Sequence, residues 1–263
     1  MNDENRSLAS AQVASQSMVP PQEVVGEMTV MPQLKSGNIR SYVLRPGRLT
    51  AGQKHALDRG LPIYGLDAEK PFDLFDAFGL TDKQDQVKPK LVVEIGFGNG
   101  ASLVEMAQAS PDICFVGIEV HTPGVGAILQ GIEAAGIENL RIYFADAHLV
   151  LTQAMASAQV DRFQLYFPDP WPKKRHHKRR FVRSDLMQLV CVRLRPGGLF
   201  HMATDWEPYA EDAKAFLNSF ELFENSDSNG GFVPRPDWRP TTKFERRGLK
   251  LGHGVWDLLY RRR

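Results

Sequence analysis

Five short apolar runs, each ending in an acidic residue, constrain the fold of this 263-residue chain more than any other feature. The runs are LVVE, FVGIE, LRIYFAD, FQLYFPD and LFHMATD, and they end at Glu94, Glu119, Asp146, Asp169 and Asp205. Near-continuous apolar runs are typical of strands that are buried on both faces, as in a parallel sheet. The acids stand 25, 27, 23 and 36 residues apart, which leaves room for a helix in each interval and is the βαβ pattern.

Helical patterns occupy these intervals. The segments 101–109, 124–135, 148–158 and 184–194 are predicted helices, and a further short helix is predicted around 50–59. Near the C-terminus, FELFEN and GVWDLLYRR predict a strand pair joined by a long connection that contains Gly and Pro. The sequence therefore predicts an α/β fold with a doubly wound, mostly parallel sheet and an antiparallel C-terminal strand.

The N-terminal part of the chain differs in composition from the rest. Residues 1–37 are rich in Ser, Gln, Ala and Glu, contain a Pro-Pro pair and lack sustained periodicity, which is typical of a disordered tail. Residues 38–263 are predicted to form a single domain, because a chain of this length with 43% hydrophobic residues can bury a normal core. Within it, residues 38–66 are predicted to form an arm laid over the main body.

No sequence signal directs the chain to a membrane or to an oxidising compartment. The first ten residues carry acids and lack the apolar core of a secretory signal, and no window approaches 18 uninterrupted apolar residues. Cys114 and Cys191 both lie in apolar runs, which predicts buried free thiols rather than a disulfide or zinc ligands. We therefore expect a cytoplasmic protein without a bound metal ion.

Positive charge is concentrated in one segment. Residues 173–183 hold seven Lys and Arg residues and no acid, whereas the whole chain has a formal net charge of +1, so the remainder stands at −6. A local basic patch on a mildly acidic body indicates a polyanionic partner at one face. A solvated loop is the alternative, but the position directly after Asp169 favours contacts with nucleic-acid phosphates.

The five acids are expected to share one edge of the sheet, because ligands of a doubly wound sheet bind beyond the carboxyl ends of its strands. Each acid could instead be a helix N-cap, and for Asp146 or Asp205 taken alone the two interpretations are about even. Two of the five are Glu, which is a poor N-cap. The set as a whole therefore favours a ligand that offers hydrogen-bond donors or positive charge.

The turn after the first predicted strand, VVEIGFGNGASL, supplies the second half of this site. Gly96, Gly98 and Gly100 form G-x-G-x-G, which lets a ligand approach the backbone at a helix start, and with Ala101 they also fit the dinucleotide fingerprint. A pyrophosphate about 5 Å from one carboxylate would meet roughly 3 kcal/mol of repulsion per charge pair at an effective dielectric of about 20. A cationic sulfonium with ribose hydroxyls and an adenine amino group would instead find acceptors. S-adenosylmethionine is therefore favoured over NAD.

Five segments together closely resemble the bacterial tRNA (guanine-N7)-methyltransferases: EIGFGNG, GIEVH, FPDPWPKKRHHKRR, MATDWEPY and TKFERRGLKLGHGVWDL. The resemblance runs from about Arg40 to the C-terminus, and its most specific part is Pro-Asp-Pro-Trp with the basic tail. It implies a Rossmann-like class I methyltransferase that uses S-adenosylmethionine, and releases S-adenosylhomocysteine, to methylate N7 of a guanine in the tRNA variable loop (position 46). The expected partner is tRNA. No protein partner is required, and a monomer or a homodimer is compatible with the sequence.

The resemblance, with the glycine turn, implies three sets of site residues, and Asp169 matches the catalytic residue. The cofactor set is Glu94, Gly96, Gly98, Gly100, Glu119, Asp146 and Asp169, in which Glu119 suits the ribose and Asp146 the adenine edge. The substrate-site positions are Lys173, Asp205, Thr242, Lys243, Phe244 and Glu245. The RNA-contacting stretch comprises Arg175, His176, His177, Lys178, Arg179 and Arg180.

Methylation of guanine N7 needs alignment more than proton transfer, because N7 already carries a lone pair, and orientation can contribute about 7 to 11 kcal/mol. Positive charge moves to the purine during transfer, and a fixed carboxylate beside the ring stabilises it. Asp169, stiffened by Pro168 and Pro170, is predicted to accept from the guanine N1–H and amino group. Trp171 is predicted either to stack on an extruded base or to pack the loop, with neither favoured.

Three other functions remain open. A small-molecule methyltransferase would share the cofactor half of the site but has no use for the basic segment. A nucleic-acid methyltransferase that acts on an amino group is compatible with Pro-Asp-Pro-Trp, which imperfectly matches the Asp/Asn-Pro-Pro-aromatic signature of that class. The third is a non-catalytic RNA-binding protein on a Rossmann-like scaffold, against which the intact set of acids argues.

Overall fold

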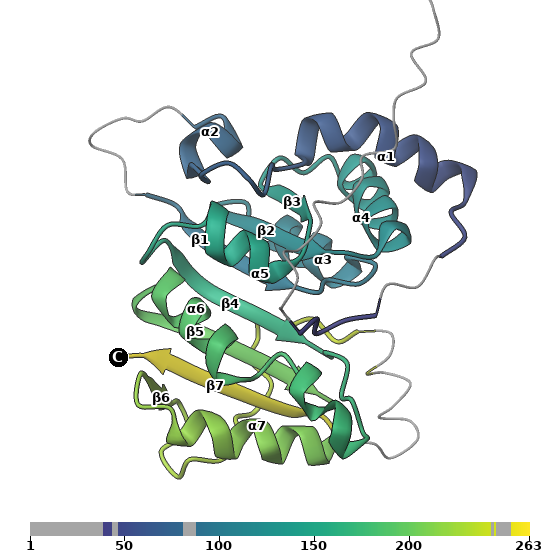
Figure 1. Ribbon diagram of the computed structural model, residues 1–263. Coiled ribbons are helices and arrows are strands. Elements are labelled where there is room, and N and C mark those ends of the chain that lie inside the picture. Colours follow the sequence, from purple (N-terminus) through teal and green to yellow (C-terminus); the bar gives the residue numbers. More distant parts are fainter. Residues whose placement is uncertain (1–38, 44–46, 81–87, 243–244, 246–253) are drawn as a thin grey trace, which may run out of the picture. The chain divides into compact units, whose positions relative to one another are not determined.

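A seven-stranded sheet organises the part of the chain that the computed structural model describes, namely residues 39–43, 47–80, 88–242, 245 and 254–263. The tail predicted over 1–37 lies outside these residues, as do Lys243 and Phe244. The strand order is β3-β2-β1-β4-β5-β7-β6 (Figure 1). The strands are β1 Lys90–Ile95, β2 Ile113–Glu119, β3 Leu140–Phe144, β4 Val160–Tyr166, β5 Leu194–Thr204, β6 Phe223–Asn225 and β7 Trp256–Arg262.

The first five strands run parallel: β1 pairs with β2 and β4, β2 with β3, and β4 with β5. β7 is antiparallel to both β5 and β6, which confirms the predicted mostly parallel sheet with an antiparallel C-terminal strand. The strand order reverses between β1 and β4. In open α/β sheets such a reversal leaves a crevice beyond the carboxyl ends of the strands, where ligands bind.

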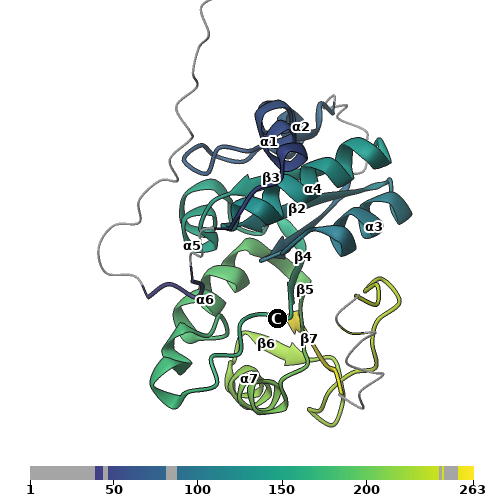
Figure 2. The same cartoon turned by 90° about the vertical axis from the view of Figure 1, so that its right-hand side faces the viewer.

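Helices pack on both faces of the sheet (Figures 1 and 2). Residues of α1, α3 and α4 pack with Val92 and Phe115 on one face, and residues of α6 and α7 pack with Val93, Val116 and Phe200 on the other. Neighbouring residues of β1 thus point to opposite faces, as the period of two in a strand requires. The helices are α1 Ala51–Tyr64, α2 Leu74–Phe78, α3 Ala101–Ala109, α4 Thr122–Ala135, α5 Ala147–Leu149, α6 Ser184–Arg193 and α7 Glu207–Ser219, with a π-helical turn, η1, at Val150–Ala154 and a 3-10 helix, η2, at Lys174–Arg179.

The connection between β6 and β7 lies on the same side of the sheet as α3 (Figure 2). Under it, β4, β5 and β7 each contribute a buried polar side chain: Gln164, His201 and Asp257 are all at most 3% exposed. Trp238 of the connection donates a hydrogen bond to His201, and Arg239 donates to Asp257. The apolar runs inferred from the sequence therefore include buried polar side chains on one face of these three strands.

Four of the five predicted helices are confirmed. α3 has the predicted limits, α6 ends one residue before the predicted 194, and α4 begins two residues before the predicted 124. The earlier start of α4 places Pro123 in its first turn, where the missing N–H of proline leaves no hydrogen bond unmade. The helix predicted around 50–59 is α1, which begins after Thr50 and Gln53 form a capping box.

The predicted helix 148–158 is wrong in its extent. The chain forms only α5 and the π-helical turn, which ends at Ala154 because the backbone of Met155 is extended. The carbonyl of Leu151 accepts a hydrogen bond from Arg193, and that of Ala154 accepts from the N–H of Phe72. These contacts across the fold use carbonyls that a longer helix would need for its own backbone.

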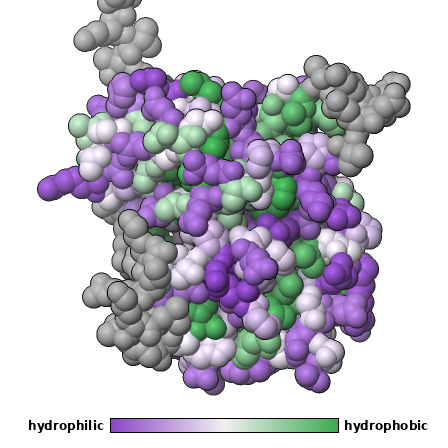
Figure 3. Space-filling model, turned by 180° about the vertical axis from the view of Figure 1, so that it is seen from behind, coloured by the Kyte–Doolittle hydropathy of each residue, from purple (hydrophilic) through white to green (hydrophobic). Residues whose placement is uncertain are grey.

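The described surface is mixed in character. On the side shown in Figure 3, hydrophobic residues form small areas among hydrophilic ones, and exposed large hydrophobic residues such as Ile63, Val192 and Leu222 belong to separate elements. Scattered apolar residues of this kind are normal on a protein surface.

Within the described residues, no helix combines the length and apolar character needed to span a membrane. Cys114 and Cys191 are buried and free, as predicted.

Candidate functional site

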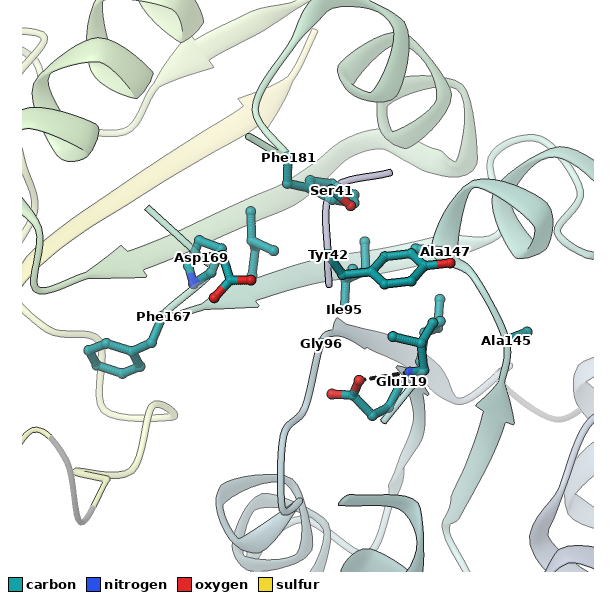
Figure 4. Close-up of a pocket in the computed structure, with 14 residues that line it drawn as sticks. Ser41, Tyr42, Ile95, Gly96, Glu119, Ala145, Ala147, Phe167, Asp169 and Phe181 are labelled. Carbon is teal, nitrogen blue, oxygen red and sulfur yellow. Dashed lines mark hydrogen bonds between the residues drawn. The ribbon is translucent and has the colours of Figure 1, made fainter. Parts of the chain in front are cut away.

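A pocket of about 220 Å³ lies beyond the carboxyl ends of β1, β2 and β4, at the edge of the sheet that the sequence predicted (Figure 4). In Figure 4 the carboxylates of Glu119 and Asp169 point toward the space between them. Two residues of the N-terminal arm complete the wall. The lining residues are Ser41, Tyr42, Ile95, Gly96, Ile118, Glu119, Val120, Ala145, Ala147, Leu165, Phe167, Pro168, Asp169 and Phe181.

The glycine-rich turn after β1 forms one wall of the pocket. Gly96, Gly98 and Gly100 have φ values of 74°, 61° and 74°, a region that side-chain-bearing residues rarely adopt. A Cβ at Gly96 or Gly98 would meet nothing within 4 Å, so open space lies over the backbone there. A Cβ at Gly100 would come within 2.4 Å of Ile128, so this glycine allows α3 and α4 to pack closely. The turn thus leaves room for a ligand at two of its three glycines.

Glu119 ties this turn to the end of β2. Its Oε2 accepts a hydrogen bond from the N–H of Gly98 (2.9 Å), and its Oε1 accepts from the N–H groups of Val120 (2.7 Å) and His121 (2.9 Å). The side chain is half-buried and lines the pocket. Because an ionised carboxylate can accept about four hydrogen bonds, Glu119 can shape the turn and still accept from a ligand.

Glu94 is buried within β1, two residues before Gly96, and does not line the pocket. Its Oε2 is buried and has no hydrogen-bond partner among the residues that the structure describes. Burial, and after it the charge of Glu119, raises the pKa of Glu94 to about 8, against the opposing effect of Arg162. A buried unpaired oxygen calls for an explanation, and a ligand with donor groups at the adjacent turn provides one.

Asp146 takes one of the two roles that the sequence left open, that of a helix N-cap, and its role toward a ligand stays a prediction. Its Oδ1 accepts a hydrogen bond from the N–H of His148 (2.7 Å), so it is the N-cap of α5. Its neighbours Ala145 and Ala147 line the pocket. The phenol of Tyr42 faces the Asp146 carboxylate: burial, followed by the charge of Asp146 and a hydrogen bond to it, raises the pKa of Tyr42. The carboxylate is thus held at the rim of the pocket between a helix start and the arm.

Asp169 is exposed, lines the pocket and stands in the middle of a strained turn. Phe167 has a φ of 50° and Trp171 a φ of 45°, a conformation that costs a non-glycine residue about 1–3 kcal/mol. The N–H of Phe167 donates to the carbonyl of Ala203 (2.8 Å), so pairing between β4 and β5 extends to the start of the turn. Strain of this kind collects at functional sites, which makes the turn a candidate functional element.

Trp171 packs the loop in this structure, which is one of the two roles predicted for it; stacking on a base stays a prediction. Its indole N–H donates a hydrogen bond to the carbonyl of Ser41 in the arm (3.2 Å). The guanidinium of Arg179 lies over its ring at 5.0 Å, and the ring of His176 meets it edge-on at 5.9 Å. The aromatic ring therefore joins the Asp169 turn to the arm and to η2.

The basic segment continues from this turn and contains η2. Four of its residues are exposed (Lys173, Lys174, Arg175 and Lys178), and three are half-buried (His176, His177 and Arg179). Partial burial, and after it the neighbouring cations, lowers the pKa of His176, so this imidazole adds no charge at neutral pH. The lysines and arginines of this set remain available to a polyanion.

Two cations of the basic segment face inward. Arg180 is 5% exposed: its Nε donates to the carbonyl of Pro170 (2.8 Å), its Nη1 pairs with Asp212, and its guanidinium lies 4.6 Å from the ring centre of Tyr209. Arg183 donates to Asp185 (2.8 Å) and to the carbonyl of Ile39 (3.1 Å). The side chain of Arg180 anchors the segment to α7, and the prediction that this residue contacts RNA stays a prediction.

The predicted substrate-site residues lie at different places. Asp205 is exposed at the end of β5 and does not line the pocket, and it is not the N-cap of α7, which is Trp206. Glu245 is 5% exposed, and Arg239 donates to both of its carboxylate oxygens (2.7 and 2.8 Å). Thr242 and Glu245 also exchange hydrogen bonds. Arg239 was not predicted, because an isolated Arg in a long connection carries no periodic signal.

The residues present fit S-adenosylmethionine. The described lining of the pocket contains two carboxylates, Glu119 and Asp169, and no Lys, Arg or His. Open space over the backbone of Gly96 and Gly98 adds room for a ligand. Acceptors without cations suit a sulfonium and hydroxyl groups better than a pyrophosphate. Among the described residues, no group of three or more His, Cys, Asp or Glu could hold a metal ion.

The arm contributes residues that sequence reasoning missed. Ser41 and Tyr42 line the pocket although they lie about 50 residues before the glycine turn. The signal that could have found them is an aromatic residue within the basic stretch NIRSYVLR, but that pattern alone does not say which surface the arm covers. Phe181, which lies within the basic segment and also lines the pocket, was missed because the cations around it do not show which way its ring points.

Comparison with known proteins places the chain in a family. Residues 88–258 match a family model described as putative methyltransferase. The tRNA (guanine-N(7)-)-methyltransferase of Shewanella oneidensis is 53% identical over 225 residues, which cover 85% of this chain and 92% of that protein. The enzymes of that name from Pseudomonas putida and Aeromonas hydrophila are each 51% identical, over 84% and 85% of this chain and 90% and 92% of theirs. Among solved structures, the 16S rRNA methyltransferase KamB matches 66% of this chain and 87% of that one, with 15% identity and a TM-score of 0.48. The extent of the sequence identity shows that this chain belongs to the tRNA (guanine-N7)-methyltransferase family.

Proposed function

We propose that the protein transfers the methyl group of S-adenosylmethionine to N7 of a guanine in the tRNA variable loop, at position 46, giving 7-methylguanosine. The names of its relatives support the reaction and the substrate class. In this chain, the observation that carries the proposal is the place of the Asp169 turn. It lines a pocket whose described wall has acids and no cations, and it leads directly into the exposed cations of segment 173–179.

S-adenosylmethionine is the methyl donor of the methyltransferase family to which the chain belongs. When bound, it supplies a methyl group on a sulfonium that a nucleophile can take directly. Gly96 and Gly98 let it approach the backbone, Glu119 accepts from its ribose hydroxyls, and Asp146 accepts at its adenine edge. The Asp169 carboxylate, at the other side of the pocket, favours positive charge there.

Asp169 positions the guanine and stabilises the charge that the purine gains. Its carboxylate is exposed, and two residues with left-handed backbone flank it, so it is available at a fixed place. Acceptance of hydrogen bonds from the guanine N1–H and amino group would fix the orientation of the purine. A preorganised carboxylate needs little rearrangement as the purine becomes cationic. For this reason it stabilises the transition state more than it stabilises the uncharged guanine before transfer.

The exposed cations of the basic segment bind tRNA phosphates. Arg175, Lys178 and Arg179 form the core of this contact together with Lys174, and His176 and His177 lie between them. Lys173, directly before η2, stands nearest to the Asp169 turn in the chain. Arg180 supports the contact indirectly, because its bonds to Pro170 and Asp212 hold the segment against the domain.

Asp205 and the segment from Thr242 to Glu245 complete the guanine side of the site in this proposal. Asp205 is exposed at the end of β5, which is the strand next to β4 and its Asp169 turn. Every group that the proposal uses comes from one chain. No protein partner is therefore required, and a monomer would suffice.

The test is methyl transfer from labelled S-adenosylmethionine to unmodified tRNA, with identification of the product nucleoside. A matched tRNA with adenine in place of the variable-loop guanine is the control. Label in 7-methylguanosine that disappears with this replacement supports the proposal. Label in another nucleoside keeps the methyltransferase but rejects N7 of that guanine. No transfer to tRNA, with the cofactor bound, would assign the pocket to another substrate.

A further inference from the structure

A buried guanidinium holds two carboxylates on the face of the sheet that the β6–β7 connection covers. Arg239 is 1% exposed. Its Nε and Nη2 donate to the two oxygens of Asp257 (2.8 and 2.9 Å), and its Nη1 and Nη2 donate to the two oxygens of Glu245 (2.7 and 2.8 Å). Both carboxylates thus receive a bidentate pair of charge-assisted hydrogen bonds, which fixes orientation as well as distance.

Asp257 anchors this cluster in the sheet. It lies in β7, is 3% exposed, and its Oδ1 also faces Nε2 of His201 (2.8 Å). Burial alone would raise the pKa of Asp257, but the hydrogen bonds from His201 and Arg239 lower it. Burial lowers the pKa of His201, so its ring is neutral at neutral pH. Because Tyr166 and Trp238 place donor groups at Nδ1 (2.9 and 3.3 Å), the ring donates to Asp257 through Nε2.

Glu245 is the other end of the cluster and belongs to the segment proposed to hold the guanine. The N–H of Glu245 donates to Thr242 Oγ1 (3.0 Å), and the N–H of Thr242 donates to Glu245 Oε2 (3.3 Å). This reciprocal pair is a capping box, which fixes the two residues relative to each other. Arg239 connects this pair to the sheet, because it bonds to both Glu245 and Asp257.

Arg239 also reaches the Asp169 turn. Its guanidinium carbon lies 5.9 Å from the ring centre of Phe167 and 6.0 Å from that of Tyr166. Phe167 lines the pocket and is the first of the two left-handed residues that flank Asp169. A single buried side chain therefore contacts the turn that bears the proposed catalytic carboxylate and the segment that bears Glu245.

We propose that Arg239 is a positioning residue for methyl transfer to guanine. Through Phe167 and Glu245 it keeps the two parts of the guanine site in register, and Asp257 supplies the fixed point. The inference rests on the function proposed above. With 1% of its surface exposed, Arg239 acts through these neighbours rather than on the substrate itself. Lysine cannot replace it, because an ammonium group cannot form two planar bidentate pairs at once.

The test is a double-mutant cycle of Arg239→Lys and Glu245→Gln. Single-turnover transfer to tRNA at saturating S-adenosylmethionine gives the rate, calorimetry gives the cofactor Kd, and thermal unfolding checks the fold. Arg239→Lys should slow transfer by roughly tenfold or more, as expected for residues coupled in one network, with the cofactor Kd unchanged within about twofold. Arg235→Lys is the matched control. It lies in the same connection and donates to the carbonyl of Arg239, and lysine retains a donor for that bond.

The cycle separates positioning from mere structural support. If Arg239 acts through Glu245, Arg239→Lys should slow the Glu245→Gln protein by less than about twofold, because coupled effects do not add. Full additivity of the two effects on the transfer rate, or an unchanged rate in Arg239→Lys, overturns the inference.

Amide exchange across residues 233–242 gives a readout that needs no activity. Faster exchange in Arg239→Lys than in Arg235→Lys is expected, and equal exchange counts against the inference. Absence of transfer to tRNA by the wild-type protein would instead reject the proposed function itself.

Discussion

Phe167 and Trp171 both have a left-handed backbone, and they stand two residues before and two residues after Asp169. Pro168 and Pro170 lie between them and restrict the backbone further. The strain persists because the turn is held at both ends: the N–H of Phe167 bonds to Ala203, and the indole of Trp171 bonds to the arm. The surrounding contacts therefore fix the turn, whereas the Asp169 carboxylate at its centre is exposed.

Replacement of Asp169 by Ala should abolish most of the methyl transfer without disturbing the fold. Loss of one preorganised electrostatic group typically slows a reaction by about 100- to 1000-fold. Because the side chain is exposed, the free energy of unfolding should change by no more than about 0.5 kcal/mol, and the Kd for S-adenosylmethionine should stay within a few-fold. Single-turnover rates and calorimetry provide the check.

The matched control for Asp169 is Asp112→Ala, which removes another exposed carboxylate, directly before β2 at the opposite end of that strand from the pocket. Its transfer rate should equal that of the wild-type protein. If Asp169→Ala instead abolished cofactor binding, the carboxylate would be a cofactor ligand, and its role toward the guanine would have to be abandoned.

Glu94→Gln should flatten the pH dependence of stability. Burial and Glu119 raise the pKa of Glu94 to about 8 from an ordinary value of 4.5. Between these two pH values the folded protein keeps a proton that the unfolded chain has released, so stability falls as pH rises, by at most about 1.4 kcal/mol per pH unit. The amide side chain of the variant cannot titrate. Denaturant unfolding at pH 5.5 and 7.5 should therefore show a smaller difference in the variant, and the same difference in both proteins would contradict the raised pKa.

The fold was predictable because apolar runs and their spacing report buried strands, whereas contacts between distant residues leave no local pattern. The run LFHMATD contains His201, yet nothing in it shows that this side chain bonds to Asp257, which Arg239 also holds. α7 was not predicted, although Tyr209, Ala213 and Leu217 are spaced for one buried helix face.

The same limit applies to the candidate site. The glycine turn was predictable because its residues are adjacent in one motif. Glu119 was predictable because it ends the apolar run FVGIE. The inward position of Arg180 was not, because its partner Asp212 lies 32 residues further along the chain. Composition shows how many cations a segment holds, but only tertiary structure shows which of them an internal acid neutralises.

Tyr42→Phe should weaken S-adenosylmethionine binding by about 3- to 10-fold, which is the usual net contribution of one hydrogen bond. The phenol lines the pocket and faces Asp146, which it helps to orient. Because the pKa of Tyr42 is raised, the phenol keeps its proton at every pH up to its ordinary value of 10, and the loss should be the same at pH 6 and pH 9. Calorimetry at both pH values tests this. Tyr64→Phe on α1 is the control, and an equal loss there would show that the effect is not specific to the pocket.

Replacement of Lys174, Arg175 and Lys178 by Ser should weaken tRNA binding and flatten its salt dependence. These three cations are exposed, and Arg180 is left in place because its burial against Asp212 and Tyr209 supports the segment. Each lost phosphate contact should reduce the slope of log K against log salt by about 0.7 to 0.9, so the three together should reduce it by roughly 2 to 3. The control replaces three exposed cations elsewhere, Lys54, Arg59 and Lys70, and should leave the slope unchanged. If both the slope and the affinity of the first variant were unchanged, the phosphates would bind to another surface. If the affinity fell but the slope stayed the same, the substitutions would have disturbed the Asp169 turn rather than the phosphate contact.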